Sequence, residues 1–215
     1  MGLPVLIMGE SGSGKTFSLR NFEIEDVSIF SIEKSRLPFQ KKLPLLKNAT
    51  YSDIEKVFLS PLQKKAYVID DSQYLLVNES FDKAKETGFG KWTDIALHFR
   101  NLIHFVNRDL PEDVIVYFLH HTEQDGLTGK VKAKTIGKLL DNQLTVEGCF
   151  DIVLLTQVKE GQYSFITQTD GYTTAKSPYG MFESTIPNDL KAVDTKIRSY
   201  YGYAPQTTNK KTKGE

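Results

Sequence analysis

The chain has 215 residues, of which 40% are hydrophobic, and this length and composition suit one globular domain better than two. Its 27 basic and 27 acidic residues balance, which excludes a protein whose overall charge attracts nucleic acid, so any basic surface must be local. The single cysteine, Cys149, excludes an internal disulfide framework and a cysteine-rich zinc site. It also indicates a reducing compartment, with the cytoplasm as the default location. No apolar run approaches the roughly 20 residues of a membrane span, so we expect no membrane contact.

Short apolar strands alternate with helix-like segments along the chain. The expected strands cover residues 3–8, 28–32, 66–70, 113–120 and 151–157. Between the third and fourth strands, apolar residues from Trp92 to Val106 repeat at helical spacing, which predicts an amphipathic helix packed on a core. Such alternation is typical of an α/β fold in which a mainly parallel sheet has helices on both faces.

The pattern changes after Gln157. Residues 158–172 alternate around Gly161, as an antiparallel hairpin would, so we expect a mixed sheet with this hairpin toward the C-terminus. Residues 204–215 contain almost no apolar side chain. We therefore expect one domain, residues 1–203, followed by a disordered polar tail, residues 204–215, which is either a solvated end or a contact arm.

The strongest motif is the glycine loop, residues 9–16 (GESGSGKT). It fits the pattern G-x-x-x-x-G-K-[ST], follows an expected strand and precedes a helix-like segment, which is the context that this motif requires. Backbone N–H groups freed by glycine would form an anion-binding concavity at a helix N-terminus, which predicts a nucleoside triphosphate ligand. Lys15 would reach the β- and γ-phosphates, and we expect it to pack against nothing in the empty protein. The expected ATP-binding residues are Gly9, Glu10, Ser11, Gly12, Ser13, Gly14, Lys15, Thr16 and Phe17.

A second segment supplies acidic groups to the same site. The apolar strand at residues 66–70 is followed by Asp71 and Ser72 and resembles a Walker B strand. A carboxylate at the C-terminal end of a strand faces the ligand crevice in such sheets, so Asp70 would hold Mg²⁺ together with the Thr16 hydroxyl. Read alone, two aspartates after a strand also fit a turn or a helix cap.

The sequence lacks the signatures of two other families of nucleotide-binding proteins. A GTPase needs an Asn-Lys-x-Asp box, and the one Asn-Lys pair, at Asn209, continues with Lys and Thr. A small-molecule kinase usually carries an arginine-rich lid that clamps phosphate, whereas this chain has few and scattered arginines. We keep a metabolic kinase only as a third alternative.

The segment SIEKS (residues 31–35) resembles the end of the second strand in RecA-like P-loop ATPases, the group that includes the DnaB-like replicative helicases. The resemblance implies that Glu33 orients and polarises the attacking water, with Asp71 as the rival base. It also implies a polar sensor of the γ-phosphate at the end of the fourth strand. His120 is the first candidate for that sensor and His121 the second.

Two later segments carry the resemblance further. Residues 126–140 contain no acid, and RecA-like proteins use the loops in this part of the fold to contact DNA backbone. The expected DNA-binding residues are Lys130, Lys132, Lys134 and Lys138, although a solvated lysine-rich loop would read the same way. The segment TTAKSPYGMFE resembles the site where relatives present a Lys-x-Arg pair to the neighbouring subunit. Lys176 matches the lysine, while Pro178 stands where the arginine is expected.

Taken together, residues 1–185 resemble the minimal RecA-core ATPases that phages encode near single-strand annealing and recombination genes. This resemblance implies an ATP hydrolase that binds single-stranded DNA, assembles with itself into a ring or filament, and acts with a single-strand binding or annealing protein. The alternative is an ATP-dependent switch or loader that acts on a protein partner such as a replicative helicase.

Overall fold

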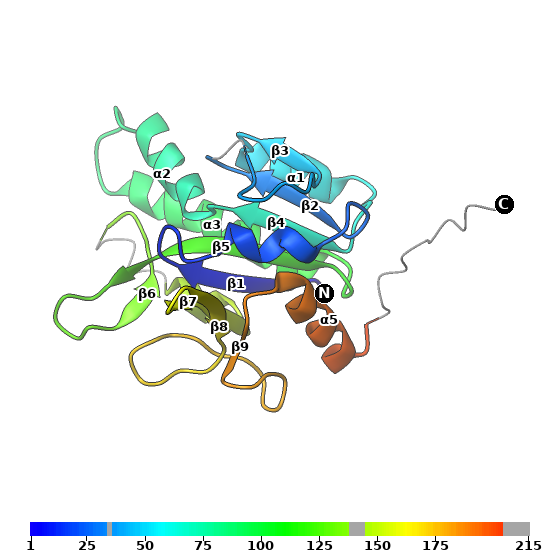
Figure 1. Ribbon diagram of the computed structural model, residues 1–215. Helices are drawn as coiled ribbons and strands as arrows, with labels where there is room; N and C mark the ends of the chain where they lie inside the picture. The colour runs from blue at the N-terminus through cyan, green and yellow to red at the C-terminus, as the bar shows by residue number, and fades with distance from the viewer. Residues whose placement is uncertain (34–35, 138–144, 204–215) are drawn as a thin grey trace.

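The computed structural model describes residues 1–33, 36–137 and 145–203 of the chain (Figure 1). The expected disordered tail, residues 204–215, and the candidate DNA-binding residue Lys138 therefore lie outside the described residues. None of the helices in the described part of the chain has both the length and the apolar character that crossing a membrane requires.

A mixed sheet of nine strands, counted over the described residues, organises the molecule. Six of them, in the order β3-β2-β4-β5-β1-β7, run parallel, and the sheet continues through the antiparallel strands β8 and β9. The short strand β6 pairs antiparallel with the end of β5. The strand bounds are β1 Leu3–Gly9, β2 Val27–Ser31, β3 Leu45–Lys47, β4 Ala66–Asp70, β5 Ile115–Gln124, β6 Val131–Ala133, β7 Ile152–Lys159, β8 Gln162–Ile166 and β9 Thr185–Pro187.

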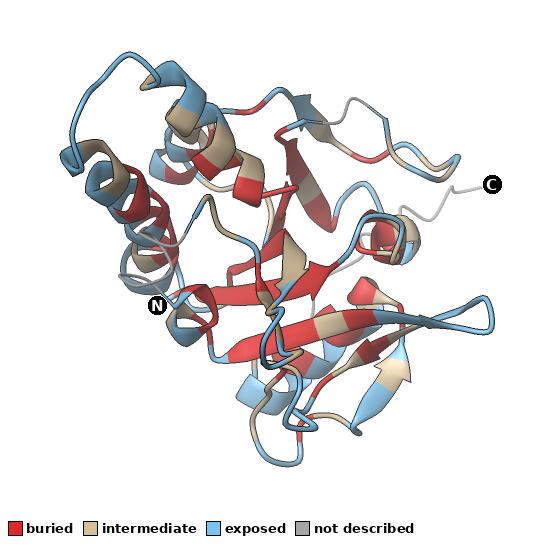
Figure 2. Ribbon diagram, turned by 90° about the vertical axis from the view of Figure 1, so that its left-hand side faces the viewer, coloured by how far each residue is buried: buried red, intermediate tan, exposed pale blue. Residues whose placement is uncertain are grey.

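Helices cover both faces of the sheet, as the sequence predicts. One face packs against α1 (Tyr51–Leu59), α2 (Gln73–Asp82), α3 (Gly90–Asp109) and the 3₁₀ helix η2 (Val146–Cys149). The other face packs against the 3₁₀ helix η1 (Thr16–Asn21) and α5 (Leu190–Tyr201), which lie in front of the sheet in Figure 1. The central strands are buried on both sides (Figure 2), as expected of parallel strands between two helical layers.

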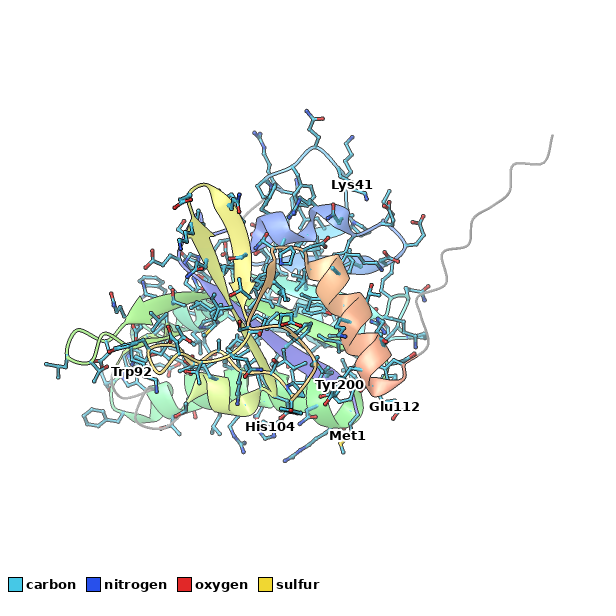
Figure 3. The ribbon with its side chains drawn as sticks, turned by 60° about the horizontal axis from the view of Figure 1, so that its bottom comes forward. Met1, Lys41, Trp92, His104, Glu112 and Tyr200 are labelled. Carbon is cyan, nitrogen blue, oxygen red and sulfur yellow. The ribbon has the colours of Figure 1, made fainter. Side chains whose placement is uncertain are left out.

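The helix α3 confirms the expected amphipathic pattern. Its apolar side chains pack on the sheet, and Figure 3 labels two of its residues, Trp92 near the start and His104 in the second half. The hairpin around Gly161 is also confirmed, since β7 and β8 pair antiparallel across Glu160 and Gly161. Both turn residues have positive φ, 53° and 75°, which matches the right-handed twist of a two-residue hairpin.

The helix expected after the glycine loop is shorter than its sequence context suggests. It is the 3₁₀ helix η1, six residues long, and the chain becomes extended at Phe22. The Phe22 side chain is fully buried in the core beneath η1, so its packing takes the chain out of the helical path.

Candidate functional site

The glycine loop connects β1 to η1 at the C-terminal edge of the parallel strands. Gly12 and Gly14 adopt φ values of 79° and 96°, a left-handed region that side chains other than glycine rarely enter. Gly9 is required for a different reason, because a β-carbon there would collide with the Thr156 hydroxyl of β7. That hydroxyl contacts Ser13 Oγ at 2.6 Å, so β7 holds the loop from one side.

Lys15 is buried rather than extended into solvent. Its side chain is 4% exposed, and its ammonium group donates hydrogen bonds to the carbonyl oxygens of Gly9 at 2.7 Å and Glu10 at 2.8 Å. The expectation that Lys15 packs against nothing in the empty protein is therefore wrong. Lys15 thus forms hydrogen bonds within the glycine loop. Its charge lies beside the pocket that an anion would enter.

Thr16 and Asp70, the two expected magnesium ligands, lie together. The Thr16 hydroxyl donates to the Asp70 carboxylate, with oxygen–oxygen distances of 2.9 and 3.1 Å, although the two residues are 54 positions apart. Asp70 is 1% exposed and ends β4. A hydroxyl and a carboxylate oxygen are hard donors of the kind that Mg²⁺ prefers.

The sheet order places two histidines between the strand that leads into the glycine loop and the strand that ends in Asp70. Strand β5 lies between β1 and β4, and it carries His120 and His121 at the level where the glycine loop begins. His120 is fully buried, and burial lowers its pKa to about 4, so the imidazole is neutral near pH 7.

Both ring nitrogens of His120 are engaged within the protein. Nε2 lies 2.8 Å from the Lys134 carbonyl oxygen, which only accepts, so this nitrogen carries the proton. Nδ1 then accepts from the Ser72 hydroxyl at 2.9 Å. His121, the second candidate, is partly exposed and its Nε2 contacts Asp71 Oδ1 at 3.2 Å. His121 is thus the better placed of the two to contact a ligand.

The two candidate bases occupy different surroundings. Asp71 is 2% exposed and has a positive φ of 61°, which is uncommon for a residue other than glycine. Glu33 is exposed two residues beyond the end of β2, and it accepts a hydrogen bond from the Asn78 side-chain amide at 2.9 Å. The structure therefore leaves both residues as candidates.

A pocket of about 470 Å³ opens beside the glycine loop. One part of its lining belongs to the loop and includes Lys15 and Thr16. The other part is largely aromatic and apolar, since the Phe17 and Tyr163 rings lie 5.6 Å apart and Pro38 adds another flat surface. The sequence offered no local signal for the residues that distant segments contribute to this pocket, which are Arg36, Pro38 and Tyr163.

Three of the candidate DNA-binding lysines lie on or next to the β5–β6 hairpin. Lys130 and Lys134 are exposed, and Lys132 lies in β6, so the three alternate along an extended segment as expected. However, Lys132 forms an ion pair with Glu123 of β5 at 3.0 Å. The absence of acids within residues 126–140 therefore did not reveal a carboxylate on the neighbouring strand.

Lys176 lies apart from the glycine loop. Its backbone exchanges hydrogen bonds of 2.9 and 2.8 Å with Val153, near the start of β7. It does not line the pocket of about 470 Å³, as far as the described residues show. The structure thus does not bring Lys176 together with the glycine loop.

A scan of the sequence against models of protein families gives no match, and a search of curated proteins also finds none. Within the described ranges, no group of three or more His, Cys, Asp or Glu side chains could hold a metal ion by itself.

Proposed function

We propose that this protein is a RecA-like P-loop ATPase that binds single-stranded DNA. The observation that carries the proposal is the contact between Thr16 of the glycine loop and Asp70 of β4. Two motifs recognised separately in the sequence meet in space, and each supplies the oxygen that Mg²⁺ needs beside a bound triphosphate. The mainly parallel sheet with helices on both faces is compatible with this family.

The pocket beside the loop matches the two chemical halves of a nucleotide. Backbone N–H groups of the loop and the Lys15 ammonium suit the phosphates. The aromatic part, formed by Phe17 and Tyr163, suits stacking of a base. A volume of about 470 Å³ lies within the range of small-molecule sites.

The residues at the metal position fit a magnesium ion. Thr16 and Asp70 would hold it together with the phosphates and water, since Mg²⁺ sites of this type use one or two protein oxygens. When bound, the ion supplies neutralisation of the charge that develops on the phosphate oxygens. The remaining chemistry belongs to the chain: Lys15 binds phosphate, Glu33 orients the attacking water, and Asp71 is the rival for that role.

The DNA part of the proposal depends on the β5–β6 hairpin. This hairpin is joined to the nucleotide side of the sheet, because the Lys134 backbone bonds both His120 and His121, at 2.8 Å in each case. The hairpin therefore lies close to the glycine loop. In a ring or filament of this chain, exposed lysines here would meet the DNA backbone, and Lys176 would face the neighbouring subunit's nucleotide.

One observation favours the alternative function. The ion pair between Lys132 and Glu123 removes part of the positive charge that DNA binding requires, and the formal charge of the chain is zero. An ATP-dependent switch or loader that acts on a protein partner needs no such charge. Stimulation of ATP turnover by a partner protein, but not by DNA, would support this alternative.

The test of the DNA function is a titration of ATP turnover with single-stranded DNA, together with oligonucleotide binding across a salt series. We expect turnover to rise with DNA. Replacing Lys130, Lys132 and Lys134 by alanine should weaken binding and flatten the slope of log affinity against log salt by about 0.7 per lost contact. The total change would be about 2 if all three lysines touch phosphate, and less if Lys132 stays with Glu123. Fluorescence anisotropy of a labelled oligonucleotide measures both quantities.

A matched control replaces three exposed lysines elsewhere, Lys56, Lys85 and Lys196. It removes the same charge and should leave the salt slope as in the wild type. Melting temperatures check that both triple variants are folded. A folded hairpin variant with unchanged affinity and slope would show that these lysines form a solvated loop, and the partner-switch function would then be preferred.

A further inference from the structure

One arginine lines the nucleotide pocket without belonging to any motif. Among the described residues around this pocket, Arg36 and Lys15 carry the positive charges. Lys15 comes from the glycine loop, whereas Arg36 comes from the segment that follows β2. The second charge is thus contributed by a distant part of the same chain.

The strand that precedes this segment ends beside the expected magnesium position. Ser31, the last residue of β2, is in register with Asp70, and the Ile32 backbone N–H donates to the Asp70 carbonyl oxygen at 3.2 Å. Asp70 in turn holds the Thr16 hydroxyl. The chain therefore leaves the sheet next to the magnesium position, on the side opposite to Tyr163 of the β7–β8 hairpin.

The residues after Arg36 are anchored to the body of the protein. Leu37, Phe39 and Leu43 pack against the core beneath η1. Lys41, labelled in Figure 3, forms an ion pair of 2.7 Å with Glu23, which lies just after η1. This anchoring holds the segment against the helix that begins at the glycine loop.

We propose that Arg36 contacts the phosphates of the nucleotide bound to its own chain. The inference rests on the proposed ATPase function and adds a residue to it. A guanidinium group is suited to this role, because its planar set of donors can bind two phosphate oxygens at once and it stays charged at any working pH. Arg36 would thereby supply, from the same chain, a second cation beside Lys15.

The test compares two ligands by calorimetry in the presence of Mg²⁺: ATP and inorganic triphosphate. The variants are Arg36→Ala, Arg36→Lys and Tyr163→Ala, with Arg100→Ala, an exposed arginine on α3, as the matched control. Arg36→Ala should weaken both ligands by the same factor, about tenfold or more, because the lost bond is to phosphate. Arg36→Lys should restore part of the affinity, since lysine keeps the charge but cannot donate two parallel hydrogen bonds to phosphate oxygens. Tyr163→Ala should weaken ATP alone.

The outcomes separate this inference from the proposed function. If Arg36→Ala weakens ATP but not triphosphate, Arg36 contacts the nucleoside and the inference is overturned. Equal affinities in Arg36→Ala and the wild type also overturn it, while the nucleotide site itself stands. If the wild type binds neither ligand, the proposed function fails, and the role of Arg36 fails with it.

Discussion

Replacing Lys15 by alanine is expected to abolish ATP turnover. The ammonium group offsets phosphate charge where it develops during hydrolysis, and no other group of the glycine loop carries a positive charge. The substitution should also destabilise the protein without nucleotide, because the carbonyl oxygens of Gly9 and Glu10 lose the hydrogen bonds that Lys15 donates. We expect the variant to lose about 1–2 kcal/mol of unfolding free energy and to remain folded. Phosphate release and thermal melting measure the two effects.

Two further variants make this result interpretable. Lys15→Met keeps the apolar stem and removes the charge, so it should also be inactive while packing more like the wild type. Lys196→Ala removes an exposed charge from α5 and should retain wild-type turnover. A folded Lys15→Ala protein that hydrolyses ATP at the wild-type rate would defeat the nucleotide assignment.

Replacing Glu33 by glutamine is expected to slow hydrolysis at least about a hundredfold while ATP still binds, which is the usual scale for losing a general base. The substitution preserves the shape of the side chain, and the new amide oxygen can still accept the bond from Asn78. Single-turnover hydrolysis and ATP affinity, measured on the same protein, separate the chemical step from binding.

The rival variant is Asp71→Asn. Asp71 is buried against His121, so this change should perturb a contact inside the protein more than the attacking water. If Asp71→Asn binds ATP but fails to hydrolyse it, and Glu33→Gln hydrolyses normally, then Asp71 is the base. The RecA-like assignment, which names Glu33, would fail with that result.

The elements that the sequence predicts well are those governed by local patterns. The strands at residues 66–70 and 151–157 are short apolar runs, and they appear as β4 and β7 with bounds that differ by at most two residues. The glycine loop is predicted between a strand and a helix, and the structure places it between β1 and η1. By contrast, β6 and β9 have three residues each, too few for a period to be recognised.

The parts of the site that the sequence does not predict depend on contacts between distant segments. Whether His120 or His121 is buried depends on the packing around β5. The sequence alone therefore does not distinguish these two adjacent histidines. Tyr163 and Arg36 reach the pocket from segments on opposite sides of the glycine loop. For the same reason, the sequence does not indicate that Glu123 of β5 pairs with Lys132 of β6.

The most direct measurement of the central claim is a calorimetric titration of the purified protein with ATP, with and without Mg²⁺. The claim is that the glycine loop, Thr16 and Asp70 form one site for a magnesium-bound nucleotide. It predicts saturable binding of one ATP per chain, and tighter binding when Mg²⁺ is present, because Thr16 and Asp70 then contribute through the ion. Absence of binding, or equal affinity with and without Mg²⁺, would contradict it.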